Sequence, residues 1–170
     1  MNLHFSLLSE ETGQADRQKF SCGIPELDAY LHRQAGQDMA RGFATVVLAR
    51  SAETSAGIFG YYAFSAASIP IVSLPQETSG KMPHYRNVPA ILLGRLAVAL
   101  PMQNRRIGSL LLFDALKRAC ASEIAWAIFM VDAQNDRAAA FYEKFNFLRF
   151  HHATYSLWIT RKQAQRLIRA

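Results

Sequence analysis

The chain has little cysteine, no long hydrophobic run and no repeat of fixed period. Its two cysteines, Cys22 and Cys120, stand far apart and form no CxxC or Cys/His spacing, so neither a disulfide framework nor a cysteine-based metal site is indicated. It lacks the run of about 18 uncharged apolar residues that a membrane span requires. Residues 1–5 carry no basic segment of a signal peptide. We therefore expect reduced thiols, no bound metal, no membrane contact and a cytoplasmic location.

The composition is that of a folded globular protein. Hydrophobic residues make up 51% of the chain, aromatic residues 11% and charged residues 19%, which excludes disordered, collagen-like and disulfide-scaffold proteins. A length of 170 residues fits one domain over residues 1–170. Nineteen Lys and Arg outnumber thirteen Asp and Glu, for a net charge of +6. Such a surface attracts an anionic partner, whether RNA, a nucleotide cofactor or an acidic protein.

The first half of the chain predicts a helix, a hairpin and a long loop. Apolar residues recur at mostly helical spacing over 26–41. The β-branched and aromatic runs 43–50 and 57–65 predict two strands, joined by a polar turn at 51–56. Residues 69–89 contain four prolines, which predicts a long loop with room for one short strand, and such loops often bind ligands.

The second half predicts a buried strand followed by a loop and a helix. Residues 88–98 are nearly all apolar, as in a central strand, and Gly94 within them predicts a bulge or a close backbone approach. An amphipathic helix begins at Ile107. The other predicted elements are a strand at 124–131, a helix at 135–145 and further strands over 147–160. The order of elements is mixed α/β.

The loop at 103–108 is a candidate anion site. It connects a central strand to the start of a helix, where unpaired backbone N–H groups and the helix dipole favour phosphate. Arg105 and Arg106 add two positive charges. The alternative interpretation is an ordinary strand–helix connection with solvated arginines.

The residues from Gln103 to Gly108 resemble the coenzyme A loop of the GCN5-related N-acetyltransferases (GNAT), which reads (Gln/Arg)-x-x-Gly-x-(Gly/Ala) after the fourth strand. Arg106 stands where the pattern has its first Gly. The resemblance implies a single-domain α/β (α+β) fold: a central mixed, mostly antiparallel sheet splayed between its fourth and fifth strands and flanked by helices. It also implies acetyl-CoA as cosubstrate. The cofactor-binding residues implied on this side are Leu96, Ala97, Val98, Gln103, Asn104, Arg105, Arg106, Ile107, Gly108 and Ser109.

A second block, residues 135–147, looks like the family segment N-x-x-A-x-x-F-Y-x-x-x-G-F. The resemblance implies that Asn135 and Phe141 contribute to cofactor binding, with Asn135 bonded to the pantetheine or to nearby backbone. Asn146 replaces the family's Gly, and Asn tolerates a left-handed conformation best after Gly. Tyr142 is the candidate general acid, because a phenol with a pKa near 10 can protonate a departing thiolate. The alternative is a tyrosine that merely fills the core.

Over nearly the whole chain the sequence resembles the acetyltransferase toxins of bacterial type II toxin–antitoxin modules. The segments that carry this likeness are FSCGIPELDAYLHRQAGQDMARGFATVVLA, LGRLAV and FYEKFNF. It implies acetylation of the α-amino group on charged tRNA, a block of translation, a ribbon-helix-helix antitoxin as partner and a possible homodimer. Candidate phosphate-binding residues are Arg33, Arg41, Lys81, Arg86, Arg95, Arg118, Lys144 and Arg149.

The predicted reaction is a direct transfer in a ternary complex, without a covalent enzyme intermediate and with Tyr142 as the acid. A dedicated general base is not required, because the amine of an aminoacyl ester is more acidic than that of lysine. Two alternatives remain open: a GNAT enzyme that acetylates a protein N-terminus, a lysine or a small amine, and a non-catalytic RNA-binding module in which Arg106 has impaired the cofactor loop.

Overall fold

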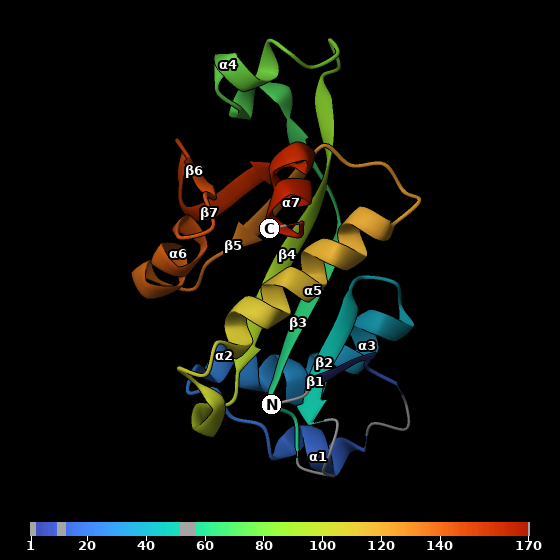
Figure 1. Ribbon diagram of the computed structural model, residues 1–170. Helices are drawn as coiled ribbons and strands as arrows, with labels where there is room; N and C mark the ends of the chain where they lie inside the picture. The colour runs from blue at the N-terminus through green and yellow to red at the C-terminus, as the bar shows by residue number, and fades with distance from the viewer. Residues whose placement is uncertain (1–2, 10–12, 52–56, 170) are drawn as a thin grey trace. The chain divides into compact units, whose positions relative to one another are not determined.

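The computed structural model describes residues 3–9, 13–51 and 57–169, so most of the turn predicted at 51–56 lies outside the described residues. The chain forms two compact units. Unit 1 comprises Met1–Ser65 and Arg95–Ala115, and unit 2 comprises Ala66–Gly94 and Leu116–Ala170. The strands follow the order β1-β2-β3-β4-β5-β7-β6 in one sheet (Figure 1).

The described elements are strands and helices in mixed order along the chain. In order they are β1 (Leu3–Leu7), α1 (Gln14–Gln18), α2 (Pro25–Ala29), the π-helical turn η1 (Tyr30–Gln34), α3 (Ala35–Ala40), β2 (Thr45–Ser51), β3 (Gly60–Pro70), the 3-10 turn η2 (Ile71–Ser73), α4 (Gln76–Ser79), β4 (Asn87–Val98), the 3-10 turn η3 (Leu100–Met102), α5 (Ile107–Ala121), β5 (Ile128–Asp132), α6 (Asp136–Glu143), β6 (Leu148–Phe150), β7 (Ala153–Thr160) and α7 (Arg161–Leu167).

The sheet is mixed, which confirms the predicted fold class. β1 pairs with β2, β2 with β3, β5 with β7 and β6 with β7, all antiparallel. β4 and β5 are parallel, and their register joins Ala90–Leu93 to Ile128–Val131. β4 continues beyond this register to Val98.

In unit 1 the helix predicted over 26–41 is present as α2, η1 and α3 in succession. Pro25 occupies its first turn, where a missing N–H costs nothing. Gly42 follows it at φ 73°, a left-handed conformation that glycine adopts without strain. The predicted hairpin is also confirmed, since β2 and β3 pair antiparallel. The π-helical turn at η1 was not predicted.

The close backbone approach predicted at Gly94 lies at Gly60 instead. A Cβ at Gly94 would meet only the side chain of Leu92, at 3.9 Å, which is ordinary contact. A Cβ at Gly60 would lie 2.8 Å from the Ala97 carbonyl oxygen and 2.8 Å from Leu111 Cδ1. The close approach predicted at Gly94 is therefore wrong: glycine is needed sterically on β3, where α5 packs against the strand.

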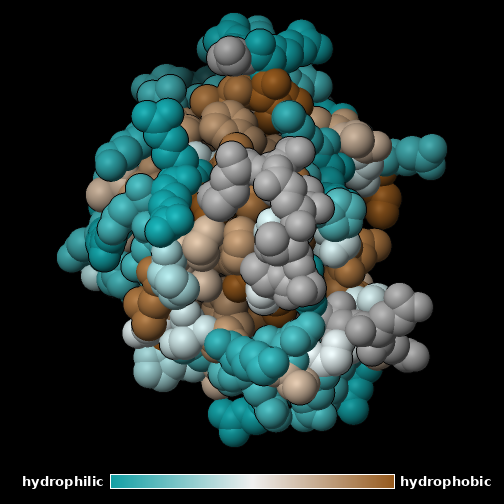
Figure 2. Space-filling view, turned by 60° about the horizontal axis from the view of Figure 1, so that its bottom comes forward, coloured by the Kyte–Doolittle hydropathy of each residue, from teal (hydrophilic) through white to brown (hydrophobic). Residues whose placement is uncertain are grey.

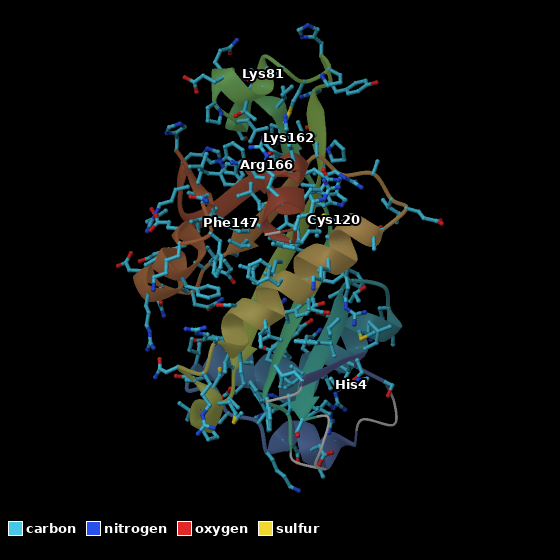
Figure 3. The ribbon with its side chains drawn as sticks, in the orientation of Figure 1. His4, Lys81, Cys120, Phe147, Lys162 and Arg166 are labelled. Carbon is cyan, nitrogen blue, oxygen red and sulfur yellow. The ribbon has the colours of Figure 1, made fainter. Side chains whose placement is uncertain are left out.

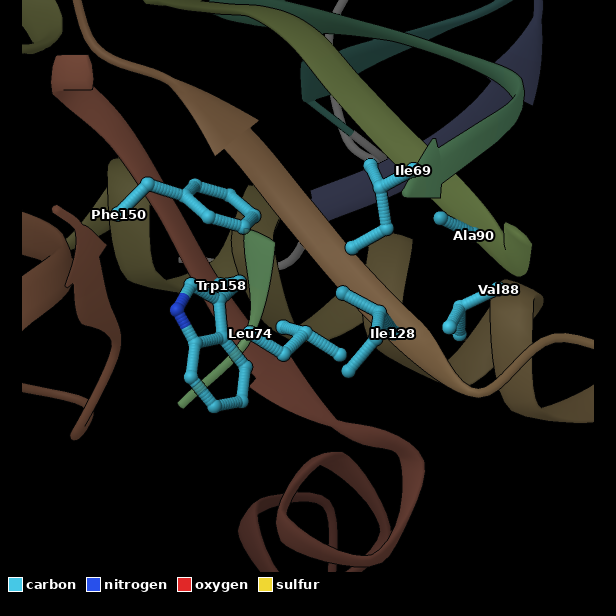
Figure 4. Packing of buried hydrophobic residues seen from close by; sticks show 7 residues of the cluster. All are labelled: Ile69, Leu74, Val88, Ala90, Ile128, Phe150 and Trp158. Carbon is cyan, nitrogen blue, oxygen red and sulfur yellow. The ribbon is translucent and has the colours of Figure 1, made fainter. Parts of the chain in front are cut away.

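In unit 2 the proline-rich segment 69–89 is more regular than the predicted loop. β3 extends to Pro70, η2 and α4 follow, and β4 already begins at Asn87. Leu74 of this segment is buried in an apolar cluster with strand residues (Figure 4). The members of the cluster are Ile69, Leu74, Val88, Ala90, Ile128, Phe150 and Trp158. The segment thus has a structural role, because it contributes to the core of this unit.

The C-terminal part departs from prediction mainly in its boundaries. β5 begins at Ile128, not at residue 124. Ile124 is exposed, and buried Trp126 donates its indole N–H to the Ala119 carbonyl oxygen at 2.8 Å. α7, which begins at a capping box between Thr160 and Gln163, was not predicted, and neither were β1 and α1. Within the part of the chain that the structure describes, no helix combines the length and apolar character needed to cross a membrane.

Candidate active site

The loop before α5 has the backbone of an anion-binding turn. Asn104 and Arg106 have φ values of 61° and 63°, two of three positive values at non-glycine residues among those described. A left-handed arginine costs roughly 1–2 kcal/mol, so this conformation is held against a local preference. Left-handed residues within a turn orient successive N–H groups into a concavity that suits phosphate. Arg106 therefore adopts the conformation for which the family pattern has glycine.

The start of α5 supplies further donors to the same place. The N–H groups of Ile107, Gly108 and Ser109 have no intrahelical acceptor, because they form the first turn of the helix. The side chains of Arg105 and Arg106 are exposed. Backbone donors, the positive end of a 15-residue helix and two guanidinium groups together fit the pyrophosphate of acetyl-CoA.

Gln103 holds this loop in place through its side chain. Its Nε2 donates to the carbonyl oxygens of Cys22, at 2.9 Å, and Val98, at 3.2 Å. The Leu100 N–H also donates to the Ser21 carbonyl oxygen, at 2.9 Å. Gln103, predicted as a cofactor residue, is thus a positioning residue by its side-chain contacts, which join the loop to the end of β4 and to the segment before α2.

At the end of β4, two backbone N–H groups point away from the neighbouring strand β3. The Ala97 carbonyl oxygen lies against Gly60 of β3, and the Ala99 N–H donates to Phe59 at 2.9 Å. Peptide groups of alternate residues along a strand point to opposite sides. The N–H groups of Leu96 and Val98 therefore point away from β3, and that of Ala97 points toward it. Of these three strand residues, all predicted to bind the cofactor, Leu96 and Val98 have N–H groups that are free of β3.

An aromatic stack lies beside β4 in unit 1. Phe20 packs edge-on against Tyr61 at 5.4 Å, Tyr61 stacks on Tyr30 at 6.2 Å, and the Arg95 guanidinium lies 3.7 Å from the centre of the Tyr30 ring. The Tyr61 hydroxyl donates to the Leu27 carbonyl oxygen at 2.7 Å. Sequence reasoning missed this group, because its members are scattered and no local spacing joins them.

A pocket of about 280 Å³ opens in unit 1 beside the end of β4. Much of its wall is apolar, with Phe20, Phe59, Leu100 and Met102 among the lining residues. Figure 2 shows one face of the molecule, on which hydrophobic residues reach the surface between hydrophilic ones. Large apolar side chains that are exposed in unit 1 include Phe43 and Leu100.

Tyr142 lies on α6 in unit 2 and is almost fully buried, with 4% of its surface exposed. Its ring packs against Phe141 at 5.1 Å and Phe147 at 5.6 Å. Burial raises the pKa of Tyr142, and the nearby Asp132 carboxylate raises it further. The phenol therefore keeps its proton at neutral pH, as a general acid must.

The ends of α6 have the predicted conformations. Asn135 caps the helix, since its side-chain oxygen accepts from the Ala138 N–H at 2.9 Å. Its contact is thus with nearby backbone, one of the two bonds expected for it. Asn146 has φ 62°, and the Phe147 N–H donates to the Tyr142 carbonyl oxygen at 3.4 Å. The left-handed conformation predicted at Asn146 is confirmed.

The predicted site residues fall into two groups. Leu96, Ala97, Val98 and residues 103–109 lie together in unit 1, and Asn135, Phe141 and Tyr142 lie together in unit 2. Neither cysteine is a strong nucleophile. Burial and Asp28 raise the pKa of the Cys22 thiol to about 11, and burial also raises the pKa of Cys120. In the described ranges no group of three or more His, Cys, Asp or Glu could hold a metal ion.

β4, which pairs in parallel with β5, leads into an anion-binding turn at the start of α5, an arrangement that suits an acyl-coenzyme A transferase. Residues 71–147 match the Acetyltransferase (GNAT) family. The chain is 36% identical over 135 residues to a tRNA-acetylating toxin of Mycobacterium tuberculosis (strain ATCC 25618 / H37Rv), covering 78% of each protein. The chain belongs to the GNAT acetyltransferase family, and it is an enzyme of that class.

Solved structures share the fold. AtaT complexed with acetyl-methionyl-tRNAfMet superimposes with a TM-score of 0.86 at 22% identity, over 98% of this chain and 99% of that one. An AtaT mutant toxin, with a tyrosine changed to phenylalanine, bound to acetyl-CoA and the C-terminus of the antitoxin AtaR, gives a TM-score of 0.81 at 19% identity over 99% of both chains.

Proposed function

We propose that this acetyltransferase transfers the acetyl group of acetyl-CoA to the α-amino group of the amino acid on charged tRNA, and so acts as a toxin that blocks translation. The observation that carries the proposal is the 36% identity, over 78% of both proteins, to a tRNA-acetylating toxin. The net charge of +6 suits an RNA substrate. Action on charged tRNA would place the protein in the cytoplasm.

In the proposed reaction the neutral α-amine attacks the thioester carbonyl directly. The turn at 103–108 and the first turn of α5 bind the pyrophosphate. The N–H groups of Leu96 and Val98 orient the pantetheine arm and stabilise the charge that develops on the carbonyl oxygen. Tyr142 donates its proton to the departing sulfur, which its raised pKa permits because the phenol remains protonated. The proton that the amine loses as the amide forms goes to solvent, from which the phenolate is protonated again. A covalent intermediate on Cys22 is disfavoured by its pKa of about 11.

The proposal includes a ribbon-helix-helix antitoxin that neutralises the enzyme. Support comes from the AtaT structure, in which a toxin of the same fold is bound to the C-terminus of its antitoxin. An antitoxin gene should lie beside this one, and its product should suppress growth arrest. A homodimer is proposed as well, and sedimentation of the purified protein would test it.

Purified protein is incubated with radiolabelled acetyl-CoA and, in separate reactions, with total charged tRNA, deacylated tRNA and a pool of peptides. The proposal expects label on charged tRNA alone and its loss with Tyr142→Phe. Label only on peptides would show an acetyltransferase with a protein substrate. Failure to bind acetyl-CoA or to transfer label would show a non-catalytic module.

A further inference from the structure

The net positive charge of this chain comes from one of its two units. Unit 1 holds eight Lys and Arg and eight Asp and Glu, so its formal charge is zero. Unit 2 holds eleven Lys and Arg against five Asp and Glu, and so accounts for the whole net charge of +6. An attraction for polyanions should therefore arise from unit 2.

The last helix concentrates this charge. Residues 161–169 contain four cations and no acidic residue. Ala164 is fully buried where α7 packs against the sheet. Lys162, Arg166 and Arg169 are all exposed, and Figure 3 labels the first two on this helix. The Arg169 N–H donates to the Arg166 carbonyl oxygen at 3.2 Å, so the helical turn continues past Leu167.

The spacing of these three residues places them on one side of α7. At about 100° per residue, positions i, i+4 and i+7 fall within roughly 60° of arc, and Ala164 faces the opposite way. With a rise of about 1.5 Å per residue they form a row roughly 10 Å long. The exposed face of α7 (Lys162, Arg166 and Arg169) is thus a continuous cationic strip.

The contacts of the described residues do not explain why cations stand at these three positions of α7. Arg161, the fourth cation, has a structural role: its guanidinium lies 5.0 Å from the Trp126 ring and donates to the Cys120 carbonyl oxygen at 3.5 Å. Among the described residues no ion pair engages Lys162, Arg166 or Arg169. Lys162 also stands in the first turn, where the helix dipole favours acidic residues.

Two cations predicted as phosphate ligands are already engaged within their own units. Arg95 stacks on Tyr30, and Arg149 forms an ion pair with Glu143 at 2.6 Å. The α7 cations were absent from that set of candidates, because the sequence did not predict the helix that aligns them.

The chemistry of the strip favours a nucleic acid over a lipid surface. Membrane-surface helices pair a cationic face with exposed Trp, Phe or Leu. No large apolar side chain of α7 is among the strongly exposed ones, and its inner side packs on the sheet. A row of cations without apolar anchors fits a chain of phosphates, whose charges are also regularly spaced.

We propose that the exposed face of α7 binds the phosphate backbone of the tRNA substrate. This inference rests on the proposed function, and it assigns the docking surface that holds the tRNA during transfer. Contacts to phosphate position a nucleic acid without reading its sequence. The strip should therefore affect the affinity for every tRNA alike.

The test compares two triple variants with the same loss of charge. Lys162→Gln/Arg166→Gln/Arg169→Gln removes the strip. The matched control, Lys19→Gln/Lys117→Gln/Arg137→Gln, removes three exposed cations that lie outside α7 and outside the candidate phosphate ligands. Binding of deacylated tRNA is measured by fluorescence anisotropy at several salt concentrations, together with KM for charged tRNA and for acetyl-CoA. Lys162→Arg/Arg166→Lys/Arg169→Lys keeps the charge and controls for folding.

The α7 variant should weaken tRNA binding and raise KM for charged tRNA at least tenfold, with KM for acetyl-CoA unchanged. The slope of log Kd against log salt should fall by about 2–3, since each lost phosphate contact removes about 0.7–0.9. The control should change affinity less than threefold, and the charge-keeping variant should behave as wild type.

Equal weakening by both Gln variants would overturn the proposal, because it would show only an effect of net charge. Unchanged tRNA binding by the α7 variant, combined with lost binding to phosphatidylserine vesicles, would assign the strip to lipid and overturn it too. If wild-type protein acetylates charged tRNA and the α7 variant keeps its KM, the surface is wrong and the proposed function stands. If wild-type protein neither binds nor acetylates charged tRNA, the proposed function itself fails.

Discussion

The side-chain amide of Gln103 donates to the backbone carbonyl of Cys22 at 2.9 Å, across 81 residues of sequence. The same amide reaches the Val98 carbonyl at 3.2 Å. One side chain thus joins the coenzyme loop, the end of β4 and the segment that leads into α2, all within unit 1.

Gln103→Ala should loosen the coenzyme loop. Two hydrogen bonds are lost, which lowers the free energy of unfolding by about 1–3 kcal/mol, and KM for acetyl-CoA should rise. Urea unfolding and calorimetric binding measure the two effects. Gln37→Ala is the matched control, because the Gln37 amide makes one exposed contact, to Arg33 at 3.4 Å. Equal effects from both variants would contradict the role of Gln103.

Arg106→Gly should distinguish two effects of Arg106: the backbone strain at this position and the contribution of its guanidinium charge to cofactor binding. Glycine relieves the left-handed conformation at φ 63°, so stability should rise by up to about 1 kcal/mol. The lost guanidinium should raise KM for acetyl-CoA. Asn146→Gly relieves a similar angle without a change of charge and should leave that KM unaltered. Thermal unfolding and initial rates are the measurements, and an unchanged KM in Arg106→Gly would remove the side chain from cofactor binding.

Tyr142→Phe should keep the fold and acetyl-CoA binding while kcat falls by about 10²–10⁴. Because burial and Asp132 raise the pKa of Tyr142, the acid stays protonated as the pH rises. The wild-type rate should climb on the acid side as the amine loses its proton and then stay level past pH 10, where an ordinary tyrosine would ionise. A decline of the rate centred near pH 10 would contradict this assignment.

Tyr30→Phe should be neutral or slightly stabilising at pH 7. The Tyr30 hydroxyl is buried and has no hydrogen-bond partner among the described residues, so its removal costs little. Tyr61→Phe, the matched comparison, loses the 2.7 Å bond to the Leu27 carbonyl and should cost about 1 kcal/mol. Chemical unfolding of both variants checks the order, and a larger loss for Tyr30→Phe would contradict it.

Alkaline pH should weaken the fold through Tyr30. Burial raises its pKa to about 12, with a smaller contribution from Asp38. Between pH 10 and 12 the unfolded tyrosine has lost its proton and the folded one has kept it, so the free energy of unfolding falls as pH rises, by at most about 1.4 kcal/mol per pH unit. Unfolding measured across this window should show a shallower decline in Tyr30→Phe, and an identical slope would contradict the assignment.

Much of the fold follows from local patterns, and the failures have physical causes. The helix over 26–41 and the hairpin carry strong periodicity, and both are present. α7 has only one fully buried side chain, Ala164, so little amphipathic pattern marks it, although Thr160 and Gln163 form a capping box. The apolar run at 124–131 did not reveal that Ile124 is exposed, because hydrophobicity alone does not give register.

The candidate site likewise has features that the sequence predicts and features that it does not. The candidate anion loop at 103–108 and the bond of Asn135 to nearby backbone could be predicted, because each depends on residues close in sequence. The contact of Gln103 with Cys22, the stack of Arg95 on Tyr30 and the cationic face of α7 could not. Each depends on a tertiary arrangement or on a helix that the sequence did not mark.

Arg106 and Asn146 have nearly the same backbone angle, φ 63° and 62°, at two places where the acetyltransferase pattern has glycine and this chain does not. At these two positions this chain therefore keeps the dihedral angle that suits glycine while carrying another amino acid. A family pattern with glycine at such positions names the residue that adopts this left-handed angle with the least strain. This chain adopts that angle with arginine and asparagine, at some cost in stability, and so gains at each turn a side chain that glycine lacks.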